Sequence, residues 1–140
     1  MAKSGLGSLK TAERELLPSP LNRGSEFYFE RFSEAVGGSH FPVEKLENYF
    51  WAQSIWDDVM SWQALEFIKR NPNDTLVILV GDFHAAYGGG LPDILKRKGF
   101  HKVKVISQTI KSGLSDRQLI QEISPHPKYG PRADWVWVTP

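Results

Sequence analysis

The fold is decided by the stretch Thr75-Leu76-Val77-Ile78-Leu79-Val80-Gly81-Asp82-Phe83-His84. Residues 75–80 are apolar or β-branched and carry no charge, which predicts a buried strand. Gly81 allows a sharp exit from this strand, and His84 follows within the exit turn. Because ligands of open α/β sheets bind at the carboxyl ends of strands, His84 is a candidate site residue.

The remaining elements are predicted on both sides of this stretch. The second half is expected to hold two more strands and two short helices, at Val103–Ser107, Trp135–Val138, Pro92–Lys98 and Ser115–Glu122. The first half is expected to be helical, with helices up to Leu17, at Glu26–Val36 and at 43–70. This order indicates an α/β fold, with a helical N-terminal half and a long central helix packed on a small, mostly parallel sheet. We expect one domain over residues 1–140, with residues 1–8 disordered.

Composition excludes several classes of protein. The 140 residues include 17 Lys and Arg, 16 Asp and Glu and no Cys, which gives a net charge of +1. Without Cys the chain has no disulfide, thiolate metal site or lipid-bearing Cys. The near-neutral charge argues against nucleic acid as a partner. No stretch approaches the roughly 18 consecutive apolar residues of a membrane span, and the first residues lack the apolar core of a signal peptide.

The long helix predicted over 43–70 has an apolar stripe that two polar residues interrupt. Gln53 and Asp57 lie one turn apart on the stripe that also holds Trp56 and Met60. Burying such groups without partners costs about 1–3 kcal/mol for an amide and more for a carboxylate. We therefore expect Gln53 and Asp57 either to hydrogen-bond a nearby loop or to line a binding site.

The opposite face of this helix is also apolar. Trp51, Ile55, Val59 and Trp62 share it, and a helix that is apolar on both sides needs partners on both sides. The predicted strands and short helices cover one face well. The other face is expected to be covered by further sequence, a second subunit or an apolar cofactor.

The turn after the first predicted strand carries groups that can bind a metal or haem. A neutral imidazole such as that of His84 binds a metal ion or haem iron, and a tyrosinate such as that of Tyr87 also binds ferric haem. The glycine run 88–90 lets backbone approach a ligand closely, but it matches neither a P-loop nor a dinucleotide-binding motif. The alternative is structural: His84 fixes the turn, and Tyr87 is a packed loop aromatic.

Three stretches of the chain resemble the ChaN-like haem-binding uptake proteins of the Tiki/TraB-type superfamily. They are the helix segment 52–60, the strand and turn 79–92 with Gly81-Asp82-Phe83-His84, and the segment 133–137, Ala-Asp-Trp-Val-Trp. The resemblance spans roughly residues 43–138. It implies an α/β domain that binds haem in bacterial iron uptake. Because the family's upstream Gly-Glu strand has no counterpart here, the chain resembles the C-terminal part of a larger domain of this kind.

We interpret the chain as a non-catalytic haem-binding protein. The iron ligand is expected to be His84 or Tyr87, with Gln53 and Asp57 at the site and Gly81 shaping the turn. The side chains of Trp56 and Met60 are expected to pack on the porphyrin, because haem buries a large apolar surface.

Two rival interpretations remain open. The first is a metal-dependent hydrolase of the Tiki type, in which a divalent metal is bound by His84 with Asp57 or Asp82. The second is an inactive scaffold.

A homodimer through the second apolar helix face is expected to cover that face and to enclose haem. The resemblance implies a periplasmic or membrane-anchored location, and membrane association requires an N-terminal anchor outside these residues.

Overall fold

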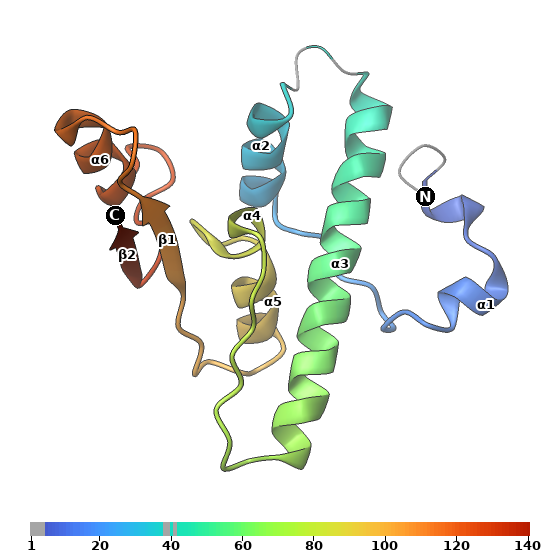
Figure 1. Cartoon of the computed structure of the whole chain (residues 1–140). Helices are drawn as coiled ribbons and strands as arrows, with labels where there is room; N and C mark the ends of the chain where they lie inside the picture. The colour runs from blue at the N-terminus through green and yellow to red at the C-terminus, as the bar shows by residue number, and fades with distance from the viewer. Residues whose placement is uncertain (1–4, 38–39, 41) are drawn as a thin grey trace.

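A computed structural model describes residues 5–37, 40 and 42–140, and the elements follow one another as shown in Figure 1. They are the 3-10 helix η1 (Leu6–Ser8), α1 (Thr11–Arg14), α2 (Glu26–Ala35), α3 (Val43–Arg70), α4 (Asp82–Ala85), α5 (Leu91–Arg97), β1 (Ile106–Ile110), α6 (Asp116–Ile123) and β2 (Trp135–Thr139). Of the residues expected to be disordered, 1–4 lie outside the described part and Leu6–Ser8 form η1. None of the helices in the described part is long and apolar enough to cross a membrane.

Helix α3 is the central element, and α2 and α5 pack along it (Figure 1). It begins directly after Pro42. Lys69 and Arg70 lie in its last turn, where their positive charges interact favourably with the negative end of the helix dipole. Helix α2 begins at Ser25, whose hydroxyl accepts a hydrogen bond from the backbone N–H of Tyr28. These signals are local in sequence, and the predicted bounds of both helices agree closely with the structure.

Strands β1 and β2 form a parallel two-stranded sheet within the described residues. Ile106 pairs with Trp135 and Ile110 with Thr139, and α6 connects the two strands. The capping box of Ser115 and Gln118 begins α6. The predicted α/β class and the parallel sheet are confirmed, and the strand predicted at Val103–Ser107 begins three residues later, at Ile106.

The strand predicted over residues 75–80 is not formed. This segment is extended, but no backbone hydrogen bond joins it to another segment in the described part of the chain. Leu76 and Val80 pack against the helices, whereas Val77 is 74% and Leu79 93% exposed. The prediction of a buried strand was wrong. The composition of residues 75–80 favours an extended backbone, but a strand also requires a neighbouring strand that accepts and donates its hydrogen bonds.

The core consists of two clusters on the same side of α3 as α2 and α5. The upper cluster is aromatic and joins α2 to α3 through Tyr28, Phe32, Leu46 and Phe50. The lower cluster joins α3 to α5, and its buried members are Ala64, Leu91 and Leu95. Phe83, the neighbour of His84 in the predicted turn, packs against the upper cluster.

The second apolar face of α3 is covered in part by the chain itself. Figure 1 shows the N-terminal segment beside α3, on the side away from α5. The Asn22 backbone N–H donates to Asp58 at 2.8 Å and the Gly24 N–H donates to Ser54 Oγ at 3.0 Å, on either side of Ile55. Ile55 is consequently 5% exposed, although the sequence suggested that its cover would come from elsewhere.

Candidate functional site

Four side chains from three helices meet at the predicted turn. His84 lies in α4 at the end of the extended segment, Gln53 and Asp57 project from α3, and Tyr28 projects from α2. His84 Nδ1 lies 2.7 Å from Asp57 Oδ1, and the Tyr28 hydroxyl donates to Asp57 Oδ2 at 3.0 Å. Gln53 Nε2 donates to the Tyr28 hydroxyl at 2.9 Å. The polar residues that interrupt the apolar stripe of α3 therefore have partners, and these partners include His84.

The geometry around the imidazole identifies which nitrogen remains for a ligand. Gln53 Nε2 lies 2.8 Å from His84 Nδ1 and 3.5 Å from His84 Nε2. An atom in line with the Nδ1 lone pair would lie much farther from Nε2 than 3.5 Å. The Gln53 amide nitrogen therefore lies off the axis of the Nδ1 lone pair. Asp57 is therefore the partner of Nδ1, and it assigns the proton to Nδ1 when its carboxylate is ionised. This leaves the lone pair on Nε2.

Burial raises the pKa values of two groups in this network. Asp57 and Tyr28 are both 0% exposed. Burial raises the pKa of the Asp57 carboxyl, and its contact with His84 offsets only part of that effect. Burial, followed by the nearby Asp57 carboxylate, also raises the pKa of the Tyr28 hydroxyl, which stays protonated and donates to Asp57.

An apolar cavity of about 370 Å³ opens beside this network, between α2 and α3. Gln53 and Trp56 form its edge toward His84, and the rest of its lining is Phe32, Val36, Leu46, Tyr49 and Ala52. The Trp56 indole is 65% exposed and stacks on the His84 ring, with ring centroids 6.2 Å apart. His84 does not itself line this cavity, but it contacts Gln53 and Trp56, which do.

Arg31 is a site residue that the sequence reasoning missed. It is 6% exposed, and its guanidinium donates to the carbonyl oxygens of Phe83, Ala86 and Gly88. It thereby holds the backbone on both sides of His84 from α2. The signal was present in the sequence, because positions 28, 31, 32 and 35 share one helix face and place an arginine within an apolar stripe.

The structure places Tyr87 on a different surface from His84. Tyr87 lines a second cavity of about 640 Å³ together with His126 and Tyr129, whereas His84 contacts Gln53 and Trp56 at the cavity between α2 and α3. Its φ of 59° lies in the left-handed region, which is uncommon for a bulky residue. The Tyr87 N–H donates to the Arg132 carbonyl at 2.7 Å, which helps to hold this conformation.

Two further predicted site residues, Met60 and Gly81, do not line the cavity between α2 and α3. Met60 packs against the lower core cluster and does not line the cavity beside Trp56. Gly81 precedes α4 with a φ of −59°, which other residues also adopt, and its carbonyl accepts from the His84 N–H at 3.0 Å. Glycine is required instead at Gly90, where an added Cβ would lie 2.4 Å from the His84 carbonyl oxygen.

The described residues contain no group of three His, Asp or Glu side chains that could hold a metal ion. Asp57 is the only carboxylate recorded in contact with His84 among these residues. The Asp82 carboxylate instead accepts from Ser107 at 2.6 Å and from Arg132 at 3.0 Å. The divalent-metal interpretation therefore has one histidine and one carboxylate together, fewer than the three protein ligands of a catalytic zinc site.

Comparison with known proteins identifies the family. The family model described as haem-binding uptake, Tiki superfamily, ChaN matches residues 1–95. The match begins earlier than the expected 43–138, and it includes Gln53, Asp57 and His84 but not β1, α6 or β2. No protein of curated function and no solved structure matches the chain. The match covers more than half of the sequence, and the chain belongs to the ChaN family of haem-binding uptake proteins in the Tiki superfamily.

Proposed function

We propose that this chain binds haem in the cavity between α2 and α3, with His84 as the iron ligand, and that it carries haem without catalysing a reaction. The observation that carries this proposal is the contact of 2.7 Å between His84 Nδ1 and the fully buried Asp57. Histidines that bind metals commonly donate their second ring N–H to a carboxylate, which sets the tautomer and makes the ligand more basic. The arrangement leaves Nε2 for iron.

The residues around His84 suit haem better than a small metal ion. A porphyrin is flat and apolar, and the cavity is lined by aromatic and aliphatic side chains. The exposed face of Trp56 provides a surface for ring stacking beside the ligand. When bound, haem supplies an iron centre, and the protein's part is to hold the imidazole, orient it and cover one porphyrin face.

Haemin titration with matched variants tests the proposal. Wild type is expected to give a saturable Soret band shift near one haem per chain. His84→Ala is expected to lose at least roughly tenfold in affinity or to change the spectrum, whereas Tyr87→Phe should leave both unchanged. Trp56→Ala should weaken binding, and Phe67→Ala, at an exposed position of the same helix outside the cavity, should not.

Two outcomes would contradict the proposal. If the titration does not saturate although the protein is folded, this chain does not bind haem. Loss of the band in Tyr87→Phe with retention in His84→Ala would place the ligand in the second cavity. We also propose that the haem-bound chain forms a homodimer through the second apolar face of α3, and size-exclusion chromatography of the haem-bound protein should then give twice the mass of the free chain.

A further inference from the structure

The two oxygens of the Asp57 carboxylate have different hydrogen-bond partners. Oδ1 lies 2.7 Å from His84 Nδ1, and Oδ2 accepts the Tyr28 hydroxyl proton at 3.0 Å. Asp57 and Tyr28 are both fully buried, so these hydrogen bonds lie in a medium of low dielectric, where they are strong. Each donor withdraws electron density from the carboxylate that the other donor would otherwise attract. Tyr28 therefore competes with His84 for the charge of Asp57.

The surroundings of the Tyr28 hydroxyl direct its single proton to Asp57. Gln53 Nε2 donates to the hydroxyl oxygen at 2.9 Å, which orients the hydroxyl and makes it a better donor. Among the described residues, the Phe83 carbonyl is the other acceptor within reach, at 3.5 Å, and it already accepts from Arg31 at 2.6 Å. Asp57 is the nearer acceptor and carries a charge when ionised, so the Tyr28 proton points to it.

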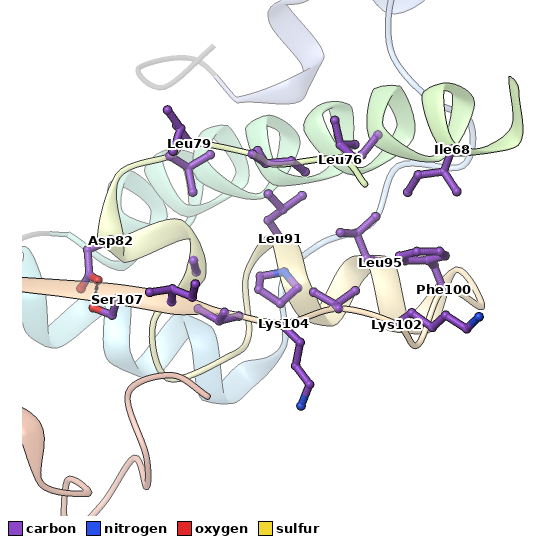
Figure 2. A pocket seen from close by; sticks show the side chains of 18 of the residues that line it. Ile68, Leu76, Leu79, Asp82, Leu91, Leu95, Phe100, Lys102, Lys104 and Ser107 are labelled. Atoms are coloured by element: carbon purple, nitrogen blue, oxygen red, sulfur yellow. Dashed lines mark hydrogen bonds between the residues drawn. The ribbon is translucent and has the colours of Figure 1, made fainter. Parts of the chain in front are cut away.

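The second carboxylate of the turn, that of Asp82, does not take part in this competition. Figure 2 shows Asp82 turned toward Ser107, whose hydroxyl donates to it at 2.6 Å, and Arg132 donates to the same carboxylate at 3.0 Å. The electron density that reaches His84 Nδ1 is therefore set by Asp57 and by the donor on the other oxygen of Asp57.

We propose that Tyr28 is a positioning residue of the candidate haem site, which makes the Asp57 carboxylate less basic and thereby raises the reduction potential of iron held by His84. This rests on the proposed function, in which His84 Nε2 binds iron. A carboxylate that attracts the Nδ1 proton strongly gives the ring the character of an imidazolate, and such a ligand favours ferric over ferrous iron. Because Tyr28 takes part of the charge of Asp57, His84 stays closer to a neutral imidazole.

Tyr28→Phe tests the proposal, because it removes the hydroxyl and keeps the ring that packs against Phe50 and Phe83. In a spectroelectrochemical titration of the haem complex, the ratio of ferric to ferrous protein at a fixed potential should rise at least roughly threefold. At about 59 mV per tenfold change for one electron, this is a fall of about 28 mV in the reduction potential. Tyr129→Phe is the matched control and should leave the potential unchanged, since it also removes a hydroxyl that donates to a carboxylate, that of Glu34, but lies outside the cavity between α2 and α3.

A double-mutant cycle with Asp57→Asn separates an effect of charge from an effect of structure. Without the carboxylate charge, Tyr28→Phe should shift the potential by less than roughly a third of its effect in the wild-type background. An equal shift in both backgrounds would overturn the proposal, because Tyr28 would then act through packing. An unchanged or raised potential in Tyr28→Phe alone would also overturn it.

The free protein provides a second measurement that needs no haem. In NMR spectra of the chain with ¹⁵N-labelled histidine, the His84 Nδ1–H proton should move downfield in Tyr28→Phe, because it is shared with a more basic carboxylate. The same resonance should stay in place in Tyr129→Phe. A downfield shift without saturable haem binding would overturn the proposed function and leave the effect of Tyr28 on His84 standing. Haem binding through His84 with an unmoved Nδ1–H resonance would overturn the role of Tyr28 alone.

Discussion

At the scale of single residues, the site depends on a carboxyl group that is buried beside a histidine. Gln53 and Asp57 were expected from the helical wheel to need partners, because both interrupt an apolar stripe. The wheel could not show that His84 is one of those partners, because the contact joins residues 27 positions apart. Tyr28 and Arg31 were missed because their role depends on how α2 packs against α3 and the turn, which local sequence does not record.

Asp57 is expected to make stability depend on pH. Burial raises its pKa in the folded chain, so the folded state retains the proton to higher pH than the unfolded chain, where an aspartate titrates near about 3.9. The free energy of unfolding should therefore fall as pH rises through the interval above that value. Asp57→Asn should lack this fall, and urea denaturation of both proteins over a pH series measures it. Parallel curves would contradict the raised pKa.

Arg31 is expected to be required for the shape of the turn that carries His84. Arg31→Met removes the donors to three backbone carbonyls that are buried or partly buried, which should cost about 3 kcal/mol of unfolding free energy. Arg97→Met, at an exposed position of α5, should change stability by no more than about 0.5 kcal/mol. Denaturant titration checks both values, and equal losses would show that Arg31 has no special role.

At the scale of elements, prediction succeeded where the signals are local. The apolar spacing, Pro42, Ser25 and Ser115 define helices whose observed bounds agree with the predicted ones. The strand over residues 75–80 could not be predicted in the same way, because composition sets its extended backbone whereas pairing depends on a neighbouring strand. The same applies to the start of β1, which begins where β2 becomes available as a partner.

The turn 81–90 is expected to tolerate little change at its closing glycine. In Gly90→Ala the new Cβ would meet the His84 carbonyl at 2.4 Å, so the backbone of His84 must move. We expect a loss of about 1–3 kcal/mol in stability and displaced imidazole resonances of His84 in NMR spectra. Gly7→Ala is the matched control, since its Cβ has no atom within 4 Å. Unchanged His84 resonances in Gly90→Ala would contradict the close packing of this turn.

At the scale of the whole molecule, the helical half and the strand half differ in how completely they are packed. Tyr28, Phe50 and Asp57 are fully buried around the candidate haem site, whereas Trp135, Trp137 and Leu79 are more than half exposed. The fold class was predictable because the order of helices and strands follows the sequence. The surfaces that remain exposed could not be predicted, because they depend on the number of strands that pair in the sheet.

Hydrogen exchange should show this difference directly. The amides of residues 75–80 make no hydrogen bond in the described structure and should exchange nearly as fast as those of an unstructured peptide. The amides paired between β1 and β2 should exchange more slowly. Mass spectrometry of peptic peptides measures both segments in one experiment. Slow exchange of residues 75–80 in the isolated chain would show that they are already paired.

His84 Nε2 is expected to bind the iron of haem while Asp57 holds Nδ1. The most direct test is electron–nuclear double resonance of the ferric haem complex prepared with ¹⁵N-labelled histidine. We expect coupling from one histidine nitrogen that is present in wild type and in Tyr87→Phe and absent in His84→Ala. A complex without histidine coupling, or one whose coupling survives in His84→Ala, would contradict it.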